Sequence, residues 1–182
     1  INHLTSAPES LVNSLKEFLI LSALMGGDIE RFEEINDRAT MLVHPTWRVN
    51  SDDENIGIER FFDWIQNIIE MLEKDLENND LEVFHKDFIN VEKRLKKNGW
   101  KGVFPKFEIV TEAVLDWVLD DLKIHQVTGG KLEKGEEFPW DNNRYHILVG
   151  GQLLVRGFTV ENLIMTYMPR DTVGNNQADT IE

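Results

Sequence analysis

Apolar residues recur at helical spacing in four stretches of the chain. Side chains at positions i, i+3, i+4 and i+7 fall on one face of a helix, so such a pattern is typical of amphipathic helices. Gly26-Gly27 follows the first stretch and Asn98-Gly99 follows the third, and glycine commonly ends a helix. The pattern predicts helices at about Leu11–Ala23, Ile58–Leu76, Leu81–Lys97 and Glu108–Leu122. Residues 50–57 are expected to form a polar loop, and residues 100–107 an irregular segment.

Four shorter apolar runs have a different character, because they are nearly continuous and bounded by proline, glycine or polar residues. Such runs are typical of strands that are buried on both faces. They lie at Met41–His44, Ile124–Val127, Tyr145–Val149 and Leu163–Met168. Strands separated by helices indicate an α/β fold, with a parallel sheet of about four or more strands and helices on both faces. We expect one domain over 1–182, with a leading helix in 1–27 and a helical insertion at 77–122 between the first two strands.

Composition narrows the function classes. The chain has 182 residues, 41% of them hydrophobic, which is typical of one globular domain. Nineteen Lys and Arg against 33 Asp and Glu leave a net charge of −14, which repels phosphate overall. A free-standing, non-specific nucleic-acid coat protein is therefore not expected, and any contact with nucleic acid needs a local basic patch or parts of a longer chain. The chain shows neither a signal peptide nor an apolar run long enough to span a membrane, so we expect a cytoplasmic location.

Several catalytic and ligand-binding motifs are absent. Gly129-Gly130-Lys131 lacks the hydroxyl residue and the spacing of a P-loop, so the chain alone is not expected to hydrolyse a nucleotide. Without cysteine there is neither a thiolate metal site nor a thiol nucleophile. Asp121-Leu122-Lys123 fits a helix end better than a Mg²⁺-dependent nuclease site. Metal ligands are therefore not predicted, and neither are residues that would cleave DNA.

Histidines and lysines supply two further hypotheses. His44, His125 and His146 lie in or beside strands, and a hydrogen-bonded core histidine is the ordinary interpretation of each. For His44, phosphate contact or catalysis is the alternative. A basic cluster could be a solvated helix face, or it could follow a phosphate backbone with Trp100 as a stacking neighbour. It comprises Lys93, Arg94, Lys96, Lys97, Lys101 and Lys106.

The segment from Tyr145 to Arg170 is the most informative. Gly150 and Gly151 follow a predicted strand, and Arg156-Gly157 lies in the turn before the next one. Glycine at the carboxyl end of a strand permits close approach, and the ligands of open α/β sheets bind at that edge. An arginine there suits phosphate or carboxylate, although a structural pairing of Arg156 with Glu161 is also open.

This segment resembles motif V of superfamily-two helicases. Arg156-Gly157-Phe158-Thr159 occupies the place of the usual R-G-x-D, with Thr159 instead of aspartate, and Gly150-Gly151 replaces the usual Thr-Asp pair. With Thr40-Met41-Leu42-Val43-His44 leading to Trp47-Arg48, the chain is similar to the endonuclease Z-one domain family. Asp179-Thr180-Ile181-Glu182 resembles the start of a motif VI helix.

The resemblance implies the second RecA-like lobe of an ATP-dependent protein that acts on DNA. ATP and Mg²⁺ would be bound by the parent protein, together with an N-terminal RecA-like lobe that this chain lacks, and the chain would be inactive alone. The nucleotide- and DNA-binding candidates are Gly150, Gly151, Arg156, Gly157 and Thr159. Candidates for contact with the DNA backbone are His44, Thr46, Arg48, Lys93, Arg94 and Lys97. A non-catalytic protein-interaction module on the same fold is the alternative hypothesis.

Overall fold

A computed structural model describes most of the chain. The described residues are 6–25, 38–45, 51–127, 138, 140, 143–150 and 159–169, with the backbone alone for 51–56. Of the predicted site residues, this range includes His44, Lys93, Arg94, Lys97, Gly150 and Thr159. Thr46, Arg48, Gly151, Arg156 and Gly157 lie outside the described residues.

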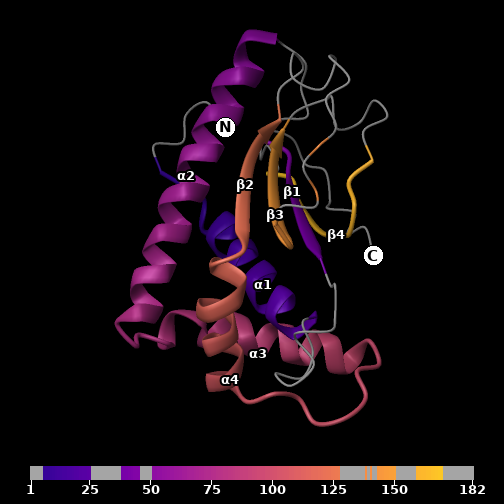
Figure 1. Ribbon diagram of the computed structural model, residues 1–182. Helices are drawn as coiled ribbons and strands as arrows, with labels where there is room; N and C mark the ends of the chain where they lie inside the picture. The colour runs from indigo at the N-terminus through magenta and orange to yellow at the C-terminus, as the bar shows by residue number, and fades with distance from the viewer. Residues whose placement is uncertain are drawn as a thin grey trace, which may run out of the picture.

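Four strands form one sheet, and every neighbouring pair is parallel. They are β1 (Ala39–Val43), β2 (Leu122–Val127), β3 (Tyr145–Gly150) and β4 (Leu163–Tyr167). Their order across the sheet is β2-β3-β1-β4, so the first strand in the sequence is an inner one (Figure 1). All four predicted strands are thereby confirmed, and so is the parallel α/β class.

The helices are α1 (Glu9–Met25), α2 (Ser51–Glu77), α3 (Glu82–Lys97) and α4 (Phe107–Ala113), and α4 continues into the π-helical turn η2 (Val114–Leu119). The predicted loop at 50–57 is wrong, because α2 already begins at Ser51. Ser51 is followed by Asp52, Asp53 and Glu54. Acidic residues in a first turn are favoured by the positive end of the helix dipole, which explains the early start.

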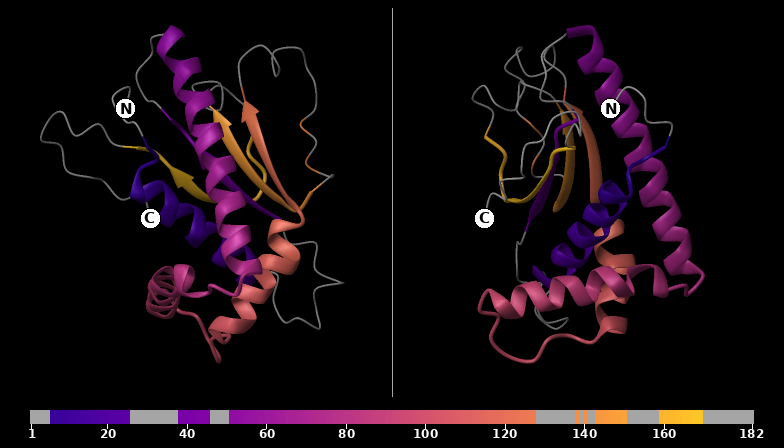
Figure 2. Two further views of the ribbon diagram at one scale, coloured as in Figure 1. Left: turned by 90° about the vertical axis from the view of Figure 1, so that its left-hand side faces the viewer. Right: turned by 180° about the vertical axis from the view of Figure 1, so that it is seen from behind.

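The main core lies between the sheet and the helices. Apolar side chains of α1 and α2 pack on the face of the sheet that carries Met41 and Ile147. The side chains of Met41 and Ile147 are themselves fully buried. Figure 2 shows α1 and α2 on this one side of the strands. Because alternate residues of a strand point to opposite faces, Leu42 and Leu148 belong to a second, smaller cluster on the other face.

Handedness explains which segments cover which face. The chain moves from β1 to the edge strand β2, and then in the opposite direction to β3 and across to β4. Crossovers between parallel strands are right-handed, so connections that run in opposite directions lie on opposite faces. The helices between β1 and β2 accordingly cover one face, while Phe138, Trp140 and Val160 from the later connections pack on the other. Helices are therefore confirmed on one face; within the described residues, these three side chains cover the second face.

The helices α3 and α4 lie at the amino ends of the strands, at the bottom of Figure 1. The turn η2 runs almost directly into β2, which places α4 below that strand. Two ion pairs join α3 to α1: Arg94 Nη2 lies 2.8 Å from Glu17 Oε2, and Lys16 Nζ lies 3.7 Å from Asp87 Oδ2. Burial raises the pKa of the Asp87 carboxyl, and the nearby Lys16 opposes that rise.

Candidate functional site

The carboxyl ends of β1 and β3 lie side by side at the upper edge of the sheet. Val43 pairs with Val149, so the next residues on each strand, His44 and Gly150, are neighbours at this edge. The chain after β1 leads to the helical face, and the chain after β3 leads to the second face. Adjacent strands whose connections diverge in this way form a topological switch point, the position where open α/β sheets bind ligands.

His44 is buried at this switch point, with only 6% of its surface exposed. Its backbone N–H donates to the carbonyl of Tyr167, 2.9 Å away, which ties the end of β1 to β4. The side-chain Nδ1 is buried and has no hydrogen-bond partner among the residues that the structure describes. The predicted core location is therefore confirmed, but the predicted hydrogen bond of the ring is not seen at this nitrogen. A buried polar atom without a partner carries a cost of about 1–3 kcal/mol.

Gly150 is the last residue of β3, is buried, and pairs with Val127 of β2. The predicted position of Gly150 at the carboxyl end of a strand is thus confirmed, and the strand order shows that this strand is an inner one. Thr159 does not share that position. It is exposed and directly precedes Val160, which packs on the second face of the sheet.

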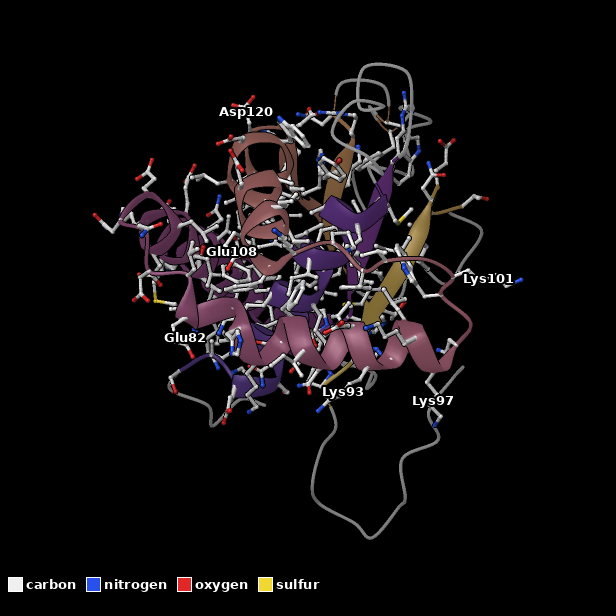
Figure 3. All side chains as sticks on the ribbon, turned by 90° about the horizontal axis from the view of Figure 1, so that it is seen from below. Glu82, Lys93, Lys97, Lys101, Glu108 and Asp120 are labelled. Atoms are coloured by element: carbon white, nitrogen blue, oxygen red, sulfur yellow. The ribbon has the colours of Figure 1, made fainter. Side chains whose placement is uncertain are left out.

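The basic cluster lies at the end of the molecule opposite the carboxyl ends of the strands. Lys93, Arg94 and Lys97 are exposed on α3, below the amino ends of the strands, as Figure 3 shows for Lys93 and Lys97. Arg94 is held by Glu17, which is a structural role. The sequence groups these residues with His44 as DNA-backbone candidates, but the fold separates the two sets by the length of the sheet.

A histidine pair lies on the second face, and the sequence predicts both as hydrogen-bonded core histidines. The core location is confirmed for His146, which is buried, whereas His125 is only partly buried. His125 Nε2 lies 3.1 Å from His146 Nδ1, and His146 Nε2 lies 2.8 Å from the carbonyl oxygen of Asn143. The carbonyl can only accept, so His146 donates from Nε2. When both rings are neutral, His146 Nδ1 is therefore the acceptor and His125 donates to it from Nε2.

Aromatic side chains surround this pair. The Phe138 ring lies 4.6 Å from His125, and the Trp140 ring lies 5.4 Å from His146, both at steep angles. Burial, with His146 and Lys123 nearby, lowers the pKa of His125 to about 4. Burial also lowers the pKa of His146, while its hydrogen bond to Asn143 acts in the opposite direction. The sequence did not predict that these two rings are in contact. The contact could have been predicted only from the pairing of β2 with β3, which places His125 and His146 on the same face of the sheet.

Asp121, which the sequence assigns to a helix end and not to a nuclease site, has a structural role. Its carboxylate accepts hydrogen bonds from Arg144 Nε at 2.6 Å and from Asn143 Nδ2 at 3.2 Å. These contacts tie the start of β2 to the start of β3. Across the part of the chain that the structure describes, no three Asp, Glu or His side chains are grouped so that they could hold a metal ion.

The strand order and pairing define this chain as an α/β domain with an all-parallel, four-stranded sheet and a topological switch point between β1 and β3. The model of the Z1 domain family matches residues 10–182, so the chain belongs to that family. This confirms the family named from the sequence as Z-one. No curated protein and no solved structure matches the chain. Among the described helices, none has the length and apolar character needed to cross a membrane.

Proposed function

We propose that this chain is the second RecA-like lobe of an ATP-dependent helicase or translocase that acts on DNA. The observation that carries the proposal is the switch point between β1 and β3. The motif V-like residues begin at Gly150, where β3 ends, and Thr46 and Arg48 follow β1 within a few residues. Both candidate segments therefore leave the sheet at the edge where ligands of this fold class bind.

The chemistry assigned to this edge is phosphate recognition. The guanidinium of Arg156 would donate two hydrogen bonds to phosphate oxygens, a geometry that arginine forms more readily than lysine. Gly150 and Gly151 would admit a phosphate or a backbone close to the strand end, because they have no side chain. His44 contributes a buried Nδ1 that has no hydrogen-bond partner among the described residues and would accept or donate a hydrogen bond when a second lobe closes over the edge.

ATP and Mg²⁺ are not assigned to this chain alone. The sequence has no P-loop, and the described residues hold no cluster of carboxylates or imidazoles suited to a metal ion. In this proposal the nucleotide and its metal are held chiefly by the N-terminal lobe of the parent protein, and Arg156 approaches the phosphates or the DNA backbone. Nuclease activity is not part of the proposal, because Asp121 is already engaged by Arg144.

The test uses ATP turnover by a longer chain that contains both lobes, measured with and without DNA. Arg156→Ala should lower DNA-stimulated turnover by about tenfold or more, since a lost hydrogen bond to a charged group costs about 1.5–3 kcal/mol. Arg94→Ala is the matched control, because this arginine lies at the far end of the sheet and pairs with Glu17. Unchanged turnover in Arg156→Ala, or ATP hydrolysis by the 182-residue chain alone, would contradict the proposal.

A further inference from the structure

Beyond the proposed function, we infer a second nucleic-acid contact surface at the amino end of the sheet, which binds a single strand by stacking a base on Trp100. We call it the lysine–tryptophan surface, and it comprises Trp100, Lys93, Lys97 and Lys101. The inference does not depend on the carboxyl edge, because α3 and the loop after it lie at the other end of the molecule (Figure 1).

Trp100 is held in place by its neighbours. Its backbone N–H donates to the carbonyl of Leu95, 3.0 Å away, and its ring lies 5.3 Å from the ring of Phe104. Phe104 is buried and packs in turn against Phe88, at 5.6 Å. Trp100 therefore stands at the outer end of a row of buried rings, yet 37% of its surface is exposed. A fixed, partly exposed indole loses little conformational entropy when a base stacks on it.

Trp100 has lysines close to it in the sequence on both sides. Lys96 is paired with Glu92 at 2.6 Å and Arg94 with Glu17, whereas Lys93, Lys97 and Lys101 have no carboxylate within 4.0 Å among the described residues. Lys93 and Lys97 are one helical turn apart, about 6 Å along the axis of α3. Figure 3 shows these two and Lys101 toward one side of this end of the molecule, and Glu82, Glu108 and Asp120 toward the other.

The charge of this surface and its exposed indole favour single-stranded nucleic acid as the partner. With a net charge of −14, the molecule as a whole repels phosphate, so attraction of a polyanion to this end needs a local group of lysines such as this one. Lysine is depleted in protein interfaces, whereas phosphate binding depends on it. Stacking on a tryptophan needs a base that is free of its duplex neighbours, which favours single strands over duplexes.

The experiment measures fluorescence anisotropy of a labelled oligothymidylate of about 20 nucleotides, long enough for one binding site, titrated with the 182-residue chain at low salt. Trp100→Ala should weaken binding by about five- to tenfold, and Trp100→Phe should retain most of the affinity because it keeps a stacking ring. Lys93→Gln, Lys97→Gln and Lys101→Gln combined should lower the slope of log affinity against log salt by about 2. The matched control for charge is Lys74→Gln on α2, an exposed lysine distant from this surface.

Four results would overturn the inference, and the first three are no binding by the wild-type chain at low salt, unchanged affinity in Trp100→Ala, and equal affinity for a duplex. Competition by polyglutamate that is insensitive to Trp100→Ala would assign the lysines to an acidic protein instead. Thermal unfolding of each variant shows whether a lost affinity reflects a lost fold, and Trp100→Phe provides the check if Trp100→Ala unfolds. The outcome for Arg156→Ala decides nothing here, so this inference and the proposed function fail separately.

Discussion

The two faces of the sheet are built on different principles. The face beneath α1 and α2 is packed with apolar side chains, including Phe61, Ile65 and Ile147, that are almost completely buried. The second face carries the His125–His146 pair, with Phe138 and Trp140 against it. Apolar burial contributes stability in proportion to area and regardless of pH, whereas a buried imidazole pair contributes only while both rings remain neutral. The comparison assigns most of the stability to the first face and the sensitivity to acid to the second.

The largest expected effect is on the helical face. Phe61 is fully buried and its ring lies 5.1 Å from Trp64 and 6.3 Å from Tyr167. Phe61→Ala should lower the free energy of unfolding by about 3–5 kcal/mol, because it removes apolar contacts and leaves a cavity. Urea denaturation followed by circular dichroism measures this, with Val103→Ala, 95% exposed, as the control that should change little. A loss below about 1 kcal/mol would show that this face is not the main source of stability.

An intermediate effect is expected on the second face when the pH falls. The pKa of His125 is about 4 in the folded chain, below the ordinary value of 6.5, so the unfolded chain binds more protons between these values. The contribution of this group is complete above pH 6.5 and is lost as the pH falls toward 4.

His125→Gln should therefore show a smaller loss of stability than the wild type between pH 7 and pH 5, measured by urea denaturation at each pH. Val103→Ala, which removes no titratable group and lies at a 95% exposed position, serves as the control and should follow the wild type. Parallel pH dependence in His125→Gln and the wild type would show that the pair on the second face does not sense acid.

The smallest expected effect on stability concerns neither face of the sheet. It tests how much the ion pairs at the amino ends of the strands contribute to the free energy of unfolding. Arg94 is about half exposed and pairs with Glu17 between α3 and α1. Arg94→Ala should cost less than about 1 kcal/mol, because exposed ion pairs gain little over solvation by water. The same denaturation assay at low and high salt measures this cost, which salt should reduce further. A cost comparable to that of Phe61→Ala would place the stability of the molecule in its polar contacts.

Much of the fold follows from local patterns. The apolar runs at 145–149 and 163–168 correspond to β3 and β4 within one residue at each end, and the spacing over 81–97 corresponds to α3. The sequence analysis does not predict the start of α2 at Ser51, because six of the seven residues at 51–57 are polar or glycine and carry no apolar period, although their acidic composition favours a helix start. The site is predicted less completely: Gly150 lies where the motif predicts, while Arg156 stays a prediction.

The sequence by itself determined the class of this protein. Apolar period and length specify which segments become buried strands and which become amphipathic helices, because those properties depend on neighbours a few residues away. Only the tertiary structure decided which segments meet. The order β2-β3-β1-β4 makes β1 and β3 share an edge, brings His125 to His146, and carries the lysines of α3 to the end opposite Gly150. Such proximities arise from the packing of distant segments and the handedness of their crossovers, which no local pattern contains.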